Sequence, residues 1–98
     1  MNNISGNIVF EDTVFSGSIN FDNKISKISP EKNKKYTNFI IPGFIDLHCH
    51  GGNGFDAMEG IEAIINLSNY HLFNGTTTLY PTTVTASLID TKFALKGF

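Results

Sequence analysis

The chain has 98 residues, enough for one small domain or for parts of two. Seven lysines, no arginine and nine acidic residues give a formal charge of −2. Nucleic acids and anionic membranes select clustered basic residues, so this balance argues against both as partners. Five of the lysines gather loosely between residues 24 and 35, in a polar, turn-rich stretch that we interpret as a solvated loop.

Targeting signals and disulfides are not evident in the sequence. Cys49 is the single cysteine, so an internal disulfide cannot form. The first residues lack the basic start and apolar run of a signal peptide. No apolar stretch approaches the roughly 20 residues that a membrane helix requires. We therefore expect a cytoplasmic protein.

Residues 4–28 alternate between apolar and polar positions in short runs, which is typical of β-strands. Asp22 and Asn23 separate two of these runs and favour a turn, because their short side chains can bond the nearby main chain. The pattern predicts a β-meander of two or three strands that ends at Ser29-Pro30. Residues 31–38 are expected to form an exposed connection.

The pattern changes at Asn38 to alternating strand and helix signals. β-Branched and aromatic runs predict strands, and isoleucines near helical spacing predict a helix that Gly75 closes. This alternation implies a parallel strand pair with a right-handed crossover, the unit of α/β folds. In chain order we expect an extended segment and strand (39–50), a flexible glycine-rich loop (51–54), a helix (59–73), a strand (76–80) and a second helix starting near residues 85–87.

His48 and His50 are the strongest functional signal. Alternate residues of a strand point to one side, so the two imidazoles share a face. With a rise of about 3.3 Å per residue, their Cα atoms should lie about 6.5 to 7 Å apart. From that separation two rings can converge on one ion at a metal–nitrogen distance of about 2.1 Å.

The strand around these histidines has two faces of different character. In a parallel barrel, helices cover the outer face, and functional groups line the C-terminal end of the inner face. The side chains of this strand fit that arrangement, with the apolar face outward and the polar face inward. The inward face carries Phe44, Asp46, His48 and His50, and the outward face carries Ile45, Leu47 and Cys49.

Structural roles compete with the functional one for each polar residue. A His-x-His pair occurs by chance, and His48 and His50 can instead be surface residues or partners of buried carbonyls. Asp46 is better explained as a structural hydrogen-bond acceptor than as a ligand. Cys49 points away from the histidines and is expected to be a small buried residue. His71 is best explained as a packing or surface residue of the helix.

The glycine-rich segment 51–54 lacks the spacing of known phosphate-binding loops. It has neither the Lys-Ser/Thr of a P-loop nor the G-x-G-x-x-G pattern. Asp56 and Glu59 follow it closely. We expect these two carboxylates to cap the start of the next helix, whose N-terminal end is positive.

The motif at Pro42 through His50, PGFIDLHCH, resembles the opening barrel strand of the amidohydrolase superfamily. Its continuation at residues 51–60, and again at 71–85, resembles the N-acetylglucosamine-6-phosphate deacetylases specifically. The resemblance covers residues 39–85. Residues 4–28 are similar only in style to the first strands of the small β-sandwich that these enzymes carry beside the barrel.

This resemblance implies an α/β fold made of the first two β/α units of an incomplete TIM barrel, preceded by a small β-meander from the amidohydrolase β-sandwich. The corresponding domains are a partial sandwich at residues 1–40 and a partial barrel at residues 41–98. A complete barrel takes about 250 residues. The chain is therefore expected to be an N-terminal fragment.

The resemblance also implies a chemistry, the hydrolysis of the acetamido group of N-acetylglucosamine 6-phosphate to glucosamine 6-phosphate and acetate. His48 and His50 correspond to ligands of a divalent metal, and Zn, Fe, Mn and Co are not distinguished. The family's other ligands and its catalytic aspartate come from later strands. We find no catalytic residue in this chain and no convincing basic group for the phosphate.

Three interpretations stay open on the sequence alone. The first is a truncated or split deacetylase, inactive by itself, whose partners are an amino-sugar phosphate and either a second copy in a homodimer or a complementing C-terminal fragment. The second is another amidohydrolase, such as a cyclic amide hydrolase. The third is a non-catalytic gene remnant.

Overall fold

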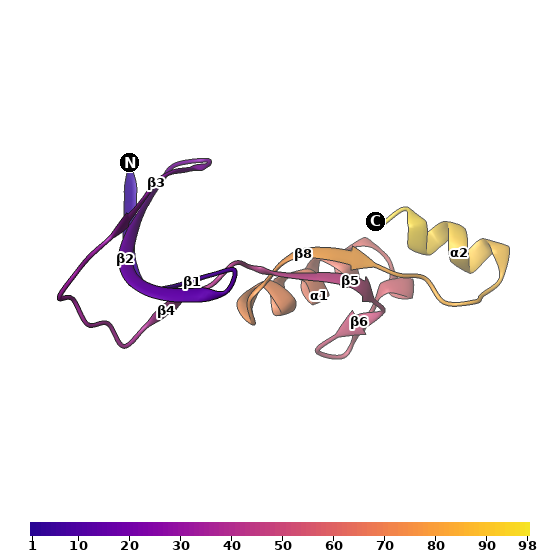
Figure 1. The fold of residues 1–98 in the computed structure, drawn as a ribbon. Helices are drawn as coiled ribbons and strands as arrows, with labels where there is room; N and C mark the ends of the chain where they lie inside the picture. The colour runs from indigo at the N-terminus through magenta and orange to yellow at the C-terminus, as the bar shows by residue number, and fades with distance from the viewer. The chain divides into compact units, whose positions relative to one another are not determined.

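A computed structural model describes all 98 residues, and the chain divides into two compact units (Figure 1). The first unit comprises Met1–Pro42 and the second Gly43–Phe98. Together they contain eight strands, two α-helices and one 3₁₀ helix, so the chain is α/β. No helix has the length and apolar character needed to cross a bilayer.

The first unit is a four-stranded sheet in the order β3-β2-β1-β4. The predicted meander is confirmed: β1 pairs with β2, and β2 with β3, both antiparallel. Glu11 takes a positive φ of 42° in the first turn. The strands are β1 (Asn2–Phe10), β2 (Thr13–Phe21), β3 (Ile25–Pro30) and β4 (Phe39–Ile40).

Strand β4 pairs parallel with β1, a contact that the sequence pattern did not predict. Asparagine side chains hold the returning chain there. The Asn7 side-chain amide donates to the Tyr36 carbonyl at 2.7 Å, and the Asn38 amide donates to the Ser5 carbonyl at 2.8 Å. Residues 31–38, predicted to be an exposed connection, are thus hydrogen-bonded to β1 at Tyr36 and Asn38.

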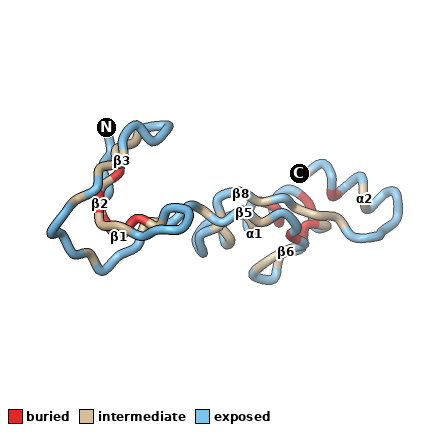
Figure 2. The backbone as a smooth tube through the Cα atoms, in the orientation of Figure 1, coloured by how far each residue is buried: buried red, intermediate tan, exposed pale blue.

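One face of this sheet is apolar and lines a hollow. Ile8 and Ile19 are buried, and the hollow also contacts Ile25, Ile28 and Ile40. Figure 2 shows that the buried positions of this unit lie on β1 and β2. The rest of the unit is largely exposed.

The second unit alternates strand and helix, as predicted. Strands β5 and β8 pair parallel, with α1 between them in sequence. Gly75, at a φ of 102°, follows the helix as expected of a closing glycine. The elements are β5 (Phe44–Cys49), β6 (Gly51–Gly52), β7 (Phe55–Asp56), the 3₁₀ helix η1 (Ala57–Glu59), α1 (Ile61–Phe73), β8 (Thr76–Pro81) and α2 (Leu88–Leu95).

The segment predicted to be a flexible loop is a small hairpin, so that prediction is wrong. Gly51 and Gly52 pair antiparallel with Asp56 and Phe55. The two residues between the strands, Asn53 and Gly54, both have positive φ, at 51° and 83°. Two consecutive positive φ angles define the tight turn that suits the natural twist of a hairpin, and Asn-Gly is its preferred sequence.

The core of this unit forms where α1 covers the strands. Leu67 of α1 is fully buried and packs with Ile64, Ala57 and Cys49, while Leu79 of β8 packs against this cluster. Figure 2 shows these buried positions gathered around α1 and the end of β5. The buried position predicted for Cys49 is confirmed. One parallel pair with its helices does not make a closed barrel, so the barrel is not shown by this structure.

Candidate metal centre

His48 and His50 converge at the C-terminal end of β5. Their Nε2 atoms lie 2.9 Å apart, and the ring planes meet at 86° with centroids 4.6 Å apart. Both side chains are exposed to solvent. The alternation of the strand therefore has the predicted result, because the two rings share one face.

The ring nitrogens lie slightly closer together than two ligands of one ion. Nitrogens bound to a tetrahedral ion at about 2.1 Å each would lie about 3.4 Å apart. The observed 2.9 Å between the Nε2 atoms is a hydrogen-bond distance, so the two rings would have to separate by about 0.5 Å to bind one ion in this geometry. The chain has no group of three or more His, Cys, Asp or Glu side chains that could hold a metal ion. The histidine pair by itself is smaller than the three protein ligands of a catalytic zinc site.

Asp46 supports the strand that carries the histidines. Its Oδ1 accepts a hydrogen bond from the His48 backbone N–H at 3.1 Å. The side chain is half-buried. A carboxylate that bonds the backbone two residues further on stabilises the local chain conformation, which is the structural role predicted for Asp46.

Thr82, immediately after β8, contacts the end of β5 through three different groups. Its N–H donates to the Cys49 carbonyl at 2.7 Å, and its Oγ1 accepts from the Cys49 N–H at 3.2 Å. Its carbonyl lies 3.0 Å from Nδ1 of His50. Sequence reasoning gave Thr82 no role, since the contact to the ring uses a main-chain oxygen.

The remaining histidine lies on the opposite side of β5. His71 is half-buried, and its Nε2 donates to the Gly51 carbonyl at 2.9 Å. The Cys49 thiol shares that acceptor at 3.4 Å and is 3.5 Å from the same ring nitrogen. His71 therefore connects α1 to the hairpin, as expected of a packing residue, and it does not join the pair on β5.

Asp56 and Glu59 form a capping box around η1. The Asp56 carboxylate accepts from the Met58 N–H at 2.8 Å, and Glu59 accepts from the Asp56 N–H at 2.7 Å. This arrangement satisfies N–H groups that a helix start leaves unpaired. The two carboxylates thus have a capping role, but they cap η1 and not the helix predicted at 59–73, since α1 begins at Ile61 after Gly60 and has no side-chain cap.

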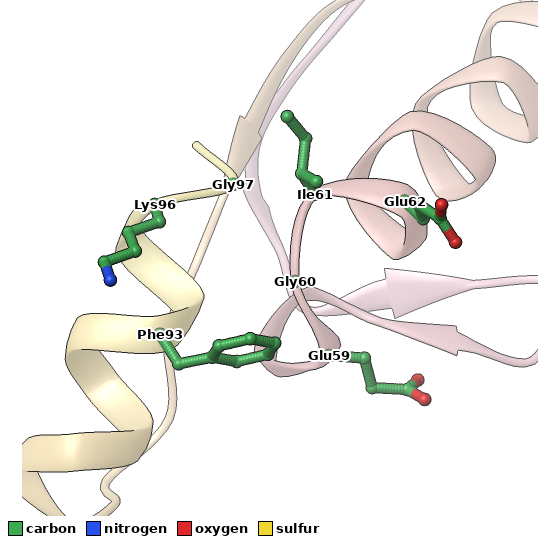
Figure 3. A pocket seen from close by; sticks show the side chains of 7 residues that line it. All are labelled: Glu59, Gly60, Ile61, Glu62, Phe93, Lys96 and Gly97. Atoms are coloured by element: carbon green, nitrogen blue, oxygen red, sulfur yellow. The ribbon is translucent and has the colours of Figure 1, made fainter.

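A separate pocket of about 430 Å³ opens between the start of α1 and the face of α2 (Figure 3). The Phe93 ring lies against Gly60, where a Cβ would come within 2.9 Å of it. Glu59, Glu62 and Lys96 also line the pocket. Neither His48 nor His50 lines this pocket, so it is separate from the candidate metal centre.

Comparison with known proteins gives several partial matches. No protein-family model matches the chain. The N-acetylglucosamine-6-phosphate deacetylase of Bacillus subtilis (strain 168) is 35% identical over 74 residues, covering 65% of this chain and 19% of that enzyme. The N-acetylgalactosamine-6-phosphate deacetylase of Escherichia coli O157:H7 is 38% identical over 58 residues, covering 58% of this chain and 15% of the relative.

An enzyme with a different name also matches. The adenine deaminase of Methanosphaera stadtmanae is 41% identical over 49 residues, covering 48% of this chain and 9% of its own length. The chain thus spans less than a fifth of the length of the curated relatives it matches. The resemblance predicted from the motifs of residues 39–85 is confirmed at the level of sequence.

Proposed function

We propose, from this relationship to the amino-sugar-phosphate deacetylases of the amidohydrolase superfamily, that the chain is the N-terminal part of a metal-dependent deacetylase. The single observation that carries the proposal is the convergence of the His48 and His50 Nε2 atoms to 2.9 Å. A strand that presents two imidazoles on one exposed face is suited to hold part of a divalent metal site. The sequence similarity supplies the reaction class.

The proposed reaction is hydrolysis of the acetamido group of N-acetylglucosamine 6-phosphate, giving glucosamine 6-phosphate and acetate. A bound divalent ion would supply an activated water, whose pKa falls to about 7, and would polarise the amide carbonyl. In this chain His48 and His50 would hold the ion, while the Asp46 carboxylate accepts a hydrogen bond from the His48 backbone and stabilises their strand. A general base is still required to move the proton to the leaving amine.

The carboxylates that lie close to the histidine pair in the sequence already have structural partners. Asp46 is engaged by the His48 backbone, and Asp56 and Glu59 cap η1. We therefore expect the isolated chain to release no acetate from the sugar phosphate. Activity requires further chain segments that complete the ligand set and bring the base.

The open edge of β5 and its exposed apolar side chains support the proposal that further chain segments are needed. We propose that residues 41–98 form the first two β/α units of a TIM barrel and residues 1–40 part of a β-sandwich. Strand β5 pairs only with β8, and its other edge is open. Ile45 and Leu47 on β5 are 65% and 70% exposed. Open edges and exposed apolar side chains favour association with a complementing fragment or a second copy.

A metal titration tests the ligand assignment directly. Zn²⁺ is titrated into the wild-type chain and into His48→Ala, His50→Ala and the double variant, with binding followed by calorimetry. We expect each single variant to lose about tenfold or more in affinity, because the pair has no third donor to compensate.

His71→Ala is the matched control for this titration. It removes the third histidine of the chain from the opposite side of β5, where the ring bonds the Gly51 carbonyl. Its Zn²⁺ affinity should stay near the wild-type value as long as circular dichroism shows a folded chain. Equal losses in the control and in the β5 variants would contradict the proposed site.

The substrate class is tested in a chimera. The segment of the Bacillus subtilis deacetylase that matches this chain is replaced by the corresponding residues, and acetate release is measured with the glucosamine and galactosamine forms of the substrate. A chimera that releases acetate, and loses this activity with His48→Ala, would support the proposal. A folded chimera that binds Zn²⁺ but is inactive on both sugars would refute the substrate class.

Hydrolytic deamination of adenine is a second candidate, favoured by the match to the Methanosphaera enzyme. The chemistry is related, because a metal-activated water attacks a carbon that bears nitrogen in both reactions. The products distinguish the candidates. Ammonia release from adenine by the same chimera, without acetate release from the sugars, would favour the deaminase.

A further inference from the structure

Hydrogen bonds to Cys49 and Tyr80 hold Thr82 against the end of β5. Its hydroxyl donates to the Tyr80 carbonyl at 3.1 Å and accepts from the Cys49 N–H at 3.2 Å. A hydroxyl has one proton and two lone pairs, so it can make both bonds at once. The Thr82 N–H bonds the Cys49 carbonyl at 2.7 Å. Both the side chain and the backbone of this residue are therefore held in one conformation.

The Thr82 carbonyl is the acceptor for the His50 ring, at 3.0 Å from Nδ1. A carbonyl can only accept, so the proton of the ring must be on Nδ1 when this bond forms. A neutral imidazole with its proton on Nδ1 has a lone pair on Nε2. That lone pair points to the Nε2 of His48, 2.9 Å away, so His48 is the donor within the metal-free pair.

We propose that Thr82 is a positioning residue that fixes the tautomer and the orientation of His50. A metal ligand of this kind needs its second nitrogen anchored, because the anchor sets which nitrogen is free to bind. Here the anchor is a main-chain oxygen at the end of β8, and the Thr82 hydroxyl holds that oxygen in place. The effect on metal affinity rests on the proposed function, whereas the tautomer does not.

Thr82→Val and Thr82→Ser separate the positioning role from a general structural one. Valine keeps the shape and β-branching of threonine and removes the hydroxyl. Serine keeps the hydroxyl, so it should restore the behaviour of the wild-type chain. Thr83→Val makes the same chemical change at the neighbouring position and is the control.

The first readout is the ring tautomer of His50, measured by ¹⁵N NMR on the metal-free chain at about pH 8, where ordinary imidazoles are neutral. We expect the wild-type chain, Thr82→Ser and Thr83→Val to carry the proton on Nδ1, and Thr82→Val to show a mixture of both tautomers. The second readout is Zn²⁺ affinity, which should fall about tenfold in Thr82→Val and recover in Thr82→Ser.

Each outcome decides one of the two claims. A wild-type His50 protonated on Nε2 would overturn the proposal without any variant, even where Thr82→Val does not fold. Unchanged tautomer and affinity in a folded Thr82→Val would overturn it as well. If no variant and no wild-type chain binds Zn²⁺ but the tautomer shifts in Thr82→Val, the positioning role stands and the proposed metal site fails.

Discussion

Replacing Leu67 by alanine should destabilise the second unit strongly. Leu67 is fully buried on α1, in a cluster with Cys49, Ala57 and Ile64. Truncation removes the apolar contacts of the side chain and leaves a cavity that the helix and strands fill only partly. Such substitutions cost about 2–5 kcal/mol.

This loss is large for a unit of this size. Residues 43–98 would have a free energy of unfolding of about 3–8 kcal/mol at the usual stability per residue. Leu67→Ala therefore removes from a quarter to all of it. Cys49, which lies between the two histidines, belongs to this cluster, so the arrangement of His48 and His50 should be lost together with the fold.

Ile65→Ala is the matched control on the same helix. Ile65 is 53% exposed, so its truncation loses little burial, and alanine is the better helix former. We expect a change within about 0.5 kcal/mol. The assay is urea unfolding followed by far-UV circular dichroism, with Zn²⁺ titration of each variant. Equal losses of stability in the two variants would show that the core is not where the structure places it.

Three further predictions concern the elements around the site. Asp46→Ala removes the acceptor of the His48 N–H and should cost about 1 kcal/mol by urea unfolding, while Asp46→Asn should recover most of it. Gly54→Ala should cost about 1 kcal/mol, because Gly54 has a φ of 83° in the hairpin turn, and an unchanged urea midpoint would contradict the turn. The buried thiol of Cys49 should react with a thiol reagent far more slowly in the folded chain than in urea, and equal rates would rule out its burial.

The local structure could be predicted from the sequence where it depends on the alternation of side chains along a strand or on one residue at a helix end. The two-residue repeat of β5 predicted that the His48 and His50 rings share a face and that Cys49 faces the core. Both hold in the structure. Gly75 marked the end of the helix before β8, and the parallel pairing of β5 with β8 followed from the strand-helix alternation.

Three features of the structure were not predicted: strand β4, the β6–β7 hairpin and the hydrogen bond that anchors His50. Strand β4 is only two residues long, and the bonds made by Asn7 and Asn38 bring it to β1. The hairpin was missed because its strands are two residues each, too short for a periodic signal, although Asn53-Gly54 is a strong turn sequence. The hydrogen-bond acceptor for the His50 ring is the Thr82 main-chain carbonyl. Every residue type has such a carbonyl, so the sequence could not indicate this contact.

The stability of the second unit and its chemistry are linked through one strand. The pleat that turns Cys49 into the core against α1 turns His48 and His50 to the opposite, exposed face, so the burial of Cys49 fixes the direction of both rings. Asp46 and Thr82 then hold the backbone and one ring by hydrogen bonds. In the proposed site the two rings would lose little conformational entropy on binding an ion, and the remaining cost would be the release of the proton that His48 donates to His50.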